Sequence, residues 1–157
     1  YDRAISFQKL KYRVAVLRDD DTQPSPETEA AFVAAGGKVV AWRDGRALED
    51  EFFFSLPDRA IQLLLDRAID LHGEALVNEH IKSASGNSLT LEICRGASTP
   101  EIRKALGKAS KAKKAGWFKS VTWMEAASRD IVAPHLHDAD QGFQKLVDGL
   151  FDWTHGK

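Results

Sequence analysis

The stretch Tyr12-Arg-Val-Ala-Val-Leu-Arg-Asp-Asp-Asp21 decides the fold, because a short apolar run rich in β-branched residues ends abruptly in charge. Residues 12–17 are typical of a strand buried on both faces. The sequence Ser25-Pro26-Glu27 then predicts a helix start, with an N-cap, a first-turn proline and an acidic residue near the positive helix end. We expect this helix to run to about residue 35, where Gly36-Gly37 provide a stop before a second strand over 38–42.

A strand, a helix and a strand in this order nearly always form a right-handed crossover between parallel strands. The sequence therefore predicts an α/β fold, with both strands pointing the same way in one parallel sheet flanked by helices. The segments that follow the two strands should leave the sheet at the same edge, where open α/β sheets bind their ligands.

The rest of the chain is predicted to be largely helical. End signals and the spacing of apolar residues indicate helices over 1–10, 58–72, 75–84, 99–116 and 141–153, with a short strand over 89–93. We divide the chain into an α/β core over residues 1–56, a helical insertion with the short strand over 57–98, and a C-terminal part over 99–157 that completes the domain.

Length and composition exclude several classes of protein. The 157 residues carry 22 Lys and Arg against 23 Asp and Glu, which suits one globular domain or a large part of one. No apolar run approaches the roughly 20 residues of a membrane span, and no signal peptide begins the chain, so we expect no membrane partner. A lone cysteine, Cys94, excludes an internal disulfide and a multi-cysteine zinc site, and a cytoplasmic location is expected.

The acidic triplet after the first strand is the strongest functional signal. An Asp-x-Asp at the end of a buried strand holds Asp19 and Asp21 side by side at the ligand-binding edge of the sheet. Two carboxylates this close repel each other unless a cation neutralises them, and hard oxygen ligands favour Mg²⁺ or Mn²⁺. The alternative is that Asp20 and Asp21 are solvated turn residues and Asp19 is a cap.

A second acidic cluster follows the second predicted strand, at Glu49-Asp50-Glu51. Since it leaves the same edge of the sheet, it can converge with Asp19 and Asp21 on a shared pair of metal ions. Of the three residues we favour Glu49 as a ligand, with Asp50 and Glu51 facing solvent. The alternative is an acidic first turn that stabilises a helix through its dipole.

The segment from Thr99 to Lys119 is basic, with seven Lys or Arg residues and one acidic residue. Lysines at this density can track a phosphate backbone, although lysine-rich helices are also common as solvated faces. Lys119 follows Gly116-Trp117-Phe118, and it could neutralise charge on a transferring phosphate or a departing oxygen. Residues 19–51 carry nine acidic and three basic residues, so the near-neutral chain contains blocks of net charge −6 and +6.

Three of these stretches together resemble the Toprim nuclease region of the OLD (overcoming lysogenization defect) ATP-dependent endonucleases. They are Val14-Ala-Val-Leu-Arg-Asp-Asp-Asp-Thr22, Leu48-Glu-Asp-Glu-Phe52 and Gly116-Trp-Phe-Lys119. The resemblance runs from about residue 12 to 153. The Asp-x-Asp motif is shared by all Toprim proteins, topoisomerases and primases included, and the other two stretches favour the OLD branch.

The resemblance implies a metal-dependent DNA endonuclease with a Toprim (Rossmann-like) sheet and a two-metal mechanism. In such a nuclease, Asp19 and Asp21 would hold Mg²⁺ or Mn²⁺, and Glu49 would be both a ligand of the second metal ion and a catalytic residue. Lys119 would be the catalytic lysine that stabilises the transition state. One metal ion would activate a water and the other would steady the leaving 3′ oxygen. The implied partners are DNA, an N-terminal ATPase domain of the same parent chain, a second copy in a homodimer and a helicase, in a role such as phage defence.

The chain also departs from the family pattern. Toprim nucleases use a glutamate at the end of an earlier strand, and no residue before Asp19 supplies it. Because the chain opens at Tyr1 without an initiator methionine, we expect it to be part of a larger enzyme, with the first Toprim strand, its glutamate and the ATPase lying elsewhere. The fragment would then bind metal weakly and be poorly active by itself.

Several rival classes are weighed against this interpretation. A haloacid-dehalogenase-type phosphatase needs Thr or Val where Gln23 stands, and a receiver domain needs a phospho-acceptor aspartate that does not stand out. The His135-Leu-His137-Asp138 sequence is more typical of a helix end before an N-cap than of a metal site. A non-enzymatic alternative is a Toprim-like module that binds DNA or dimerises without catalysis.

Overall fold

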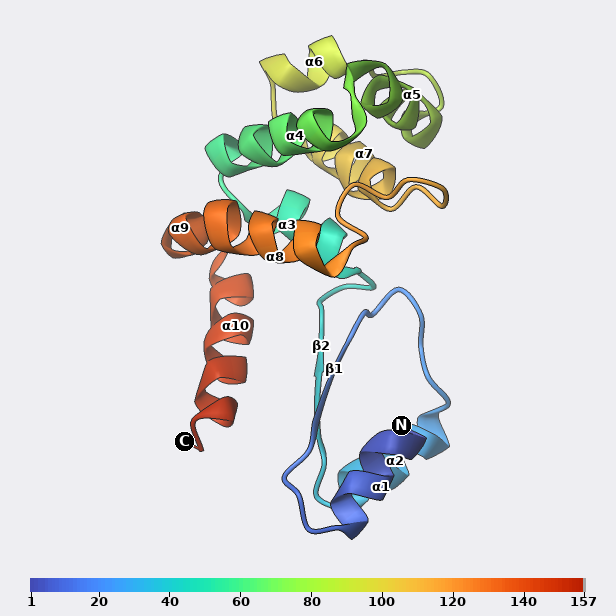
Figure 1. Ribbon diagram of the computed structural model, residues 1–157, viewed down its shortest axis with the longest axis vertical. Coiled ribbons are helices and arrows are strands. Elements are labelled where there is room, and N and C mark those ends of the chain that lie inside the picture. Colours follow the sequence, from blue (N-terminus) through green and yellow to red (C-terminus); the bar gives the residue numbers. More distant parts are fainter. Residues whose placement is uncertain (157) are drawn as a thin grey trace. The chain divides into compact units, whose positions relative to one another are not determined.

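A parallel pair of strands joined by a helix forms the sheet that the sequence predicts. The expectation that the first strand is buried on both faces is wrong, because Leu17 is 45% exposed. The computed structural model describes residues 1–156, in which β1 (Ala15–Arg18) and β2 (Lys38–Ala41) pair in parallel (Figure 1). Ala15 lies opposite Lys38, and Arg18 lies opposite Ala41. The described residues are otherwise mostly helical, and the α/β class expected from the sequence is confirmed in this coarse sense.

The crossover helix α2 (Pro26–Ala34) begins and ends where its sequence signals lie. The Oγ of Ser25 accepts a hydrogen bond from the N–H of Thr28 (3.4 Å), which satisfies one free donor of the first turn. The two glycines after the helix have separate roles. Gly36 adopts a φ of +87°, and a side chain at Gly37 would collide with the ring of Phe32, which is fully buried.

The chain divides into two compact units. The first contains residues 1–48 and 148–157, and the second contains residues 49–147. The first unit begins with α1 (Asp2–Lys9), which confirms the helix expected over residues 1–10. Tyr1 packs its ring edge-on against Phe32, with the ring centroids 5.3 Å apart.

The second unit is built from helices around an aromatic and aliphatic core. Its successive elements are α3 (Leu48–Ser55), α4 (Asp58–His72), α5 (Glu74–Ser85), α6 (Leu91–Gly96), α7 (Pro100–Ser110), α8 (Val121–Ala127), a π-helical turn (Ser128–Val132), α9 (Ala133–His135), a 3₁₀ turn (Leu136–Asp138) and α10 (Gln141–Thr154). The first residue of α3 and the last turns of α10 are grouped with the first unit. Fully buried large side chains include Phe53, Leu64, Leu65, Trp117 and Phe118.

Two sequence predictions in this unit are wrong. Residues 89–93 do not form a strand, because Thr90 caps α6 through its Oγ1, which accepts from the N–H of Ile93, and Leu91 and Cys94 are buried one helical turn apart. The basic helix ends at Ser110 rather than at Gly116. The carbonyl of Ser110 accepts from the N–H of Trp117 (2.9 Å), so the chain turns back there and burial of Trp117 outweighs helix propagation.

The other helices match their sequence signals more closely. Gly73, with a φ of +81°, ends α4 as expected, and Thr99 caps α7. The Oδ1 of Asp140 accepts from the N–H groups of Gly142 and Phe143 at the start of α10, which confirms the N-cap expected after His137. None of the helices over residues 1–156 is both long and apolar enough to cross a membrane.

Candidate functional site

The acidic turn after β1 is bound to the loop that follows β2. The N–H of Asp20 donates to the carbonyl of Arg46 (2.8 Å), and the N–H of Gly45 donates to Asp20 Oδ2 (2.9 Å). The loop reverses at Asp44 and Gly45, which both have positive φ values, of 55° and 70°. The two segments therefore leave the sheet at the same edge, as the parallel crossover predicts.

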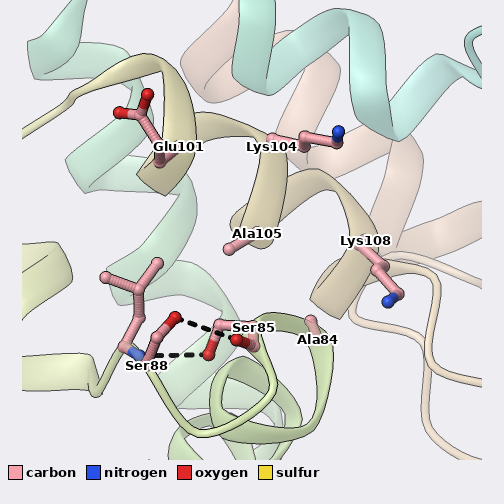
Figure 2. Close-up of a pocket in the computed structure, with 8 residues that line it drawn as sticks. Ala84, Ser85, Ser88, Glu101, Lys104, Ala105 and Lys108 are labelled. Carbon is pink, nitrogen blue, oxygen red and sulfur yellow. Dashed lines mark hydrogen bonds between the residues drawn. The ribbon is translucent and has the colours of Figure 1, made fainter.

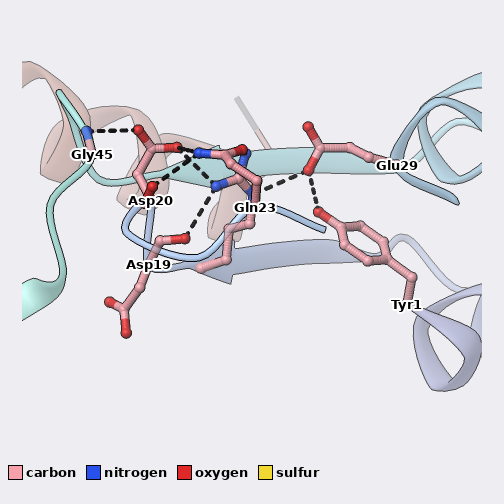
Figure 3. A network of polar contacts seen from close by, with 7 residues as sticks. Tyr1, Asp19, Asp20, Gln23, Glu29 and Gly45 are labelled. Carbon is pink, nitrogen blue, oxygen red and sulfur yellow. Dashed lines mark hydrogen bonds and ion pairs between the residues drawn. The ribbon is translucent and has the colours of Figure 1, made fainter. Parts of the chain in front are cut away.

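Asp19 and Asp20 have different roles in this turn. Asp20 lies at the centre of a network in which its Oδ1 accepts from Arg18 (2.9 Å) and from the amide of Gln23 (2.8 Å), as Figure 3 shows. The pKa of Asp20 is lowered by the hydrogen bond from Gln23, by Arg18 and by the N–H of Gly45. Asp20 is therefore a structural residue that holds the turn in shape.

Asp19 is exposed, and its carboxylate points away from the Asp20 network (Figure 3). Its Oδ1 accepts from the backbone N–H of Leu48 (3.0 Å), and its Oδ2 accepts no hydrogen bond from any described residue. Asp21 is exposed in the same turn. The turn thus presents one carboxylate oriented by the backbone, with one oxygen open, beside a second acidic residue.

The second acidic cluster lies in the first turn of α3, and each of its residues has a different environment. Glu49 is half-buried. Asp50 pairs with Lys111, whose Nζ lies 2.5 Å from Asp50 Oδ2, and Glu51 is fully buried and accepts a hydrogen bond from Ser55 (2.7 Å). The expectation that Asp50 and Glu51 face solvent is therefore wrong, because α3 packs on several sides within its unit.

Lys119 follows a firmly anchored segment. Trp117 and Phe118 are buried, and Trp117 is held at its backbone N–H by Ser110, at its carbonyl by His72 Nε2 (3.1 Å), and at its indole N–H by His80 Nδ1 (3.2 Å). The Cγ and Cδ atoms of Lys119 lie close over Gly116, where a side chain would meet them at 3.0 Å. The ammonium end is exposed and makes no ion pair with the described residues.

The contact with Trp117 gives His80 a role that the sequence did not reveal. Burial lowers the pKa of His80, and the neighbouring His72 lowers it further. Neutral His80 can accept the indole hydrogen bond, whereas the doubly protonated ring cannot. Helical spacing from His72 to His80 gives no sign of this contact, since Trp117 lies 37 residues further along the chain.

The residues predicted as metal ligands or catalytic groups fall in different parts of the chain. Asp19 and Asp21 share the turn of the first unit, whereas Glu49 and Lys119 belong to the second unit. Within residues 1–156 no group of three or more His, Cys, Asp or Glu side chains is close enough together to enclose a metal ion. The chemistry of the acidic turn still suits a hard cation, because the open oxygen of Asp19 belongs to a carboxylate, the ligand type that such cations prefer.

Comparison of the chain with protein families, characterised proteins and solved structures finds no match. A function for the site is therefore inferred from the chemistry of its own residues.

Proposed function

We propose that this chain is the Toprim-type part of a metal-dependent DNA endonuclease of the OLD kind. The observation that carries the proposal is the environment of Asp19 at the carboxyl end of β1, with one oxygen oriented by the N–H of Leu48 and the other open. Asp20 has several protein partners, whereas Asp19 keeps one carboxylate oxygen open, so we assign the cation to Asp19 together with its neighbour Asp21.

The protein residues would divide the work as follows. Asp19 and Asp21 would hold a Mg²⁺ or Mn²⁺ ion, and Glu49 would serve a second one. When bound, such a metal pair supplies an activated water and steadies the departing oxygen of the phosphodiester. Lys119, on its anchored segment, would neutralise negative charge that develops at the phosphate.

The proposal is tested by Asp19→Asn. The amide oxygen of asparagine can still accept from the N–H of Leu48, so the turn should keep its shape while the charged ligand is lost. In NMR spectra, we expect Mn²⁺-induced broadening of the amide signals of residues 19–21 to need at least about tenfold more metal. A loss of metal affinity of about tenfold already follows mutation of residues that only hydrogen-bond to a ligand. Any nicking of supercoiled plasmid that the wild-type chain shows with Mg²⁺ or Mn²⁺ should be lost in parallel.

The matched control is Asp66→Asn, which removes the same charge from an exposed position of α4 that has no partner among the described residues. This variant should behave as the wild type in both measurements. If Asp19→Asn binds Mn²⁺ and nicks DNA as well as the control does, the assignment of the acidic turn is wrong. A wild-type chain that shows no metal-induced change at residues 19–21 would favour the non-enzymatic module instead.

A further inference from the structure

A shallow trough follows the seam between α5 and α7 in the second unit. These two helices pack against each other, and two open hollows lie along their contact. The first, of about 290 Å³, lies between the end of α5 and the exposed side of α7 (Figure 2). The second, of about 450 Å³, lies beside His80 and the chain that leaves α7. Both hollows are lined by Ala84 and Lys108, so they adjoin there.

Lysines line this trough from one end of α7 to the chain beyond it. Lys104 and Lys108 border the first hollow, and Lys108 and Lys113 border the second. All three are exposed, and none of them forms an ion pair or hydrogen bond with any residue over 1–156. By contrast, Lys111 is paired with Asp50, and Arg103 has its guanidinium against the carbonyls that end α3.

The arrangement differs from that of an ordinary solvated helix face. Lys104 and Lys108 are four residues apart, a spacing at which like charges repel, and the sequence places no acidic residue between or beyond them on α7. Among the described residues, Glu101 is the one carboxylate that lines either hollow, and it lies at the start of α7. The positive charge therefore increases along the trough from Glu101 toward Lys113.

The two serines at the end of α5 that line the trough are already engaged. Ser88 donates its hydroxyl to the carbonyl of Ser85 (2.8 Å), and Ser85 donates to the carbonyl of Lys82 while accepting from the N–H of Leu89. These hydroxyls stabilise the turn after α5. The charged donors in the trough are the lysine ammonium groups, which contact phosphates as point charges.

We propose that the phosphate backbone of duplex DNA docks along this seam, with Lys104, Lys108 and Lys113 contacting successive phosphates. The proposal rests on the proposed function for the identity of the polyanion, and it adds a binding surface distinct from the acidic turn. Lys104 and Lys108 lie about 6 Å apart along the helix axis, a separation that phosphates of one strand can match. Binding through these contacts is independent of base sequence and falls steeply with salt.

The test is the triple variant Lys104→Ala, Lys108→Ala, Lys113→Ala, measured by fluorescence anisotropy on a labelled 30-bp duplex in EDTA. Loss of three phosphate contacts should weaken binding roughly 100-fold at 0.1 M salt and reduce the slope of log K against log salt by about 2.7. The control variant Lys9→Ala, Arg59→Ala, Lys145→Ala removes three exposed charges elsewhere that form no ion pair with the described residues, and it should bind almost as the wild type does. Circular dichroism and thermal melting verify that both variants are folded.

The outcomes separate this surface from the acidic turn. Equal losses in the two triple variants, or no binding of the duplex by the wild type, would overturn the seam as a DNA surface. Binding of the wild type to vesicles with anionic lipid, but not to DNA, would do the same. If the triple variant of Lys104, Lys108 and Lys113 loses DNA binding, the seam is supported as a DNA surface even if the acidic turn binds no metal. If this variant binds DNA normally, the seam is rejected as a DNA surface, but the nuclease assignment still stands.

Discussion

Arg18 holds the acidic turn by bridging two carboxylates. Its Nε donates to Glu29 (3.0 Å) and its Nη1 donates to Asp20 (2.9 Å), from the last position of β1. The pKa of Glu29 is lowered by the hydroxyl of Tyr1 and then by Arg18, and the pKa of Asp20 is lowered by Gln23 and then by Arg18. This one side chain therefore ties the acidic turn to the crossover helix.

We predict that Arg18→Met, which keeps the apolar stem, raises the pKa of both carboxyls while the contacts with Tyr1 and Gln23 keep each below its ordinary value. A carboxyl with a lowered folded-state pKa stabilises the fold above its unfolded pKa of about 4, and this contribution is lost as the pH falls through the folded value. The variant should therefore be less stable than the wild type at pH 7, with the difference fading toward about pH 3. Carboxyl NMR titrations and urea midpoints measure these two effects, and an equal deficit at both pH values would contradict the prediction.

At the scale of elements, two helix-interior glycines have opposite surroundings. Gly107 lies in α7, and a Cβ there would approach the Oδ1 of Asp50 at 2.8 Å and its Cα at 3.2 Å. Gly149 lies in α10, and a Cβ there would have no neighbour within 4 Å among the described residues. Helix propensity favours alanine at both positions, so packing alone separates them.

We predict that Gly107→Ala destabilises the protein by about 1–3 kcal/mol, the usual cost of overpacking. The new methyl group would press on the Cα of Asp50, a backbone atom of α3 that cannot move aside as a side chain can. Gly149→Ala should stabilise it by about 0.5–1 kcal/mol, since alanine reduces the entropy of the unfolded chain without a clash. Urea denaturation of the two variants measures both values. If both substitutions change the free energy of unfolding in the same direction, α7 does not approach Asp50 as closely as described.

The contrast between local and distant contacts also explains which parts of the fold the sequence could predict. Ser25, Thr99 and Gly73 act within a few residues of themselves, and the helix ends that they set lie close to the positions predicted from the sequence. The end of α7 depends on Trp117, and the pairing of Asp50 depends on Lys111, 61 residues away. Patterns of neighbouring residues carry no information about such contacts.

The candidate site follows the same division. The side of the sheet at which Asp19 and the loop after β2 meet follows from the parallel crossover, and the structure bears it out. The roles of Asp19 and Asp20 within the triplet could not be predicted, because they depend on donors from Gln23, Gly45 and Leu48. The roles of Glu49 and Lys119 remain predictions.

At the scale of the whole molecule, the two units bury very different amounts of apolar surface. Among the described residues of the first unit, the buried hydrophobic side chains are Phe32, Trp42 and Ala47, around a sheet of two short strands. Two-stranded sheets by themselves have marginal stability in water. The second unit buries several aromatic and many aliphatic side chains, Leu64 of α4 and Trp117 among them.

We therefore predict that the first unit opens at a lower free energy than the second. In native-state hydrogen exchange, the paired amides of β1 and β2 should exchange through a smaller opening free energy than those in the middle of α4. Phe32→Leu should further reduce protection in the two strands and leave α4 unchanged, because the ring of Phe32 packs between α2 and the start of β2. Leu64→Ala should instead cost about 2–5 kcal/mol of protection in α4. Strand amides as protected as those of α4, or a loss in α4 on changing Phe32, would show that the chain opens as one cooperative body.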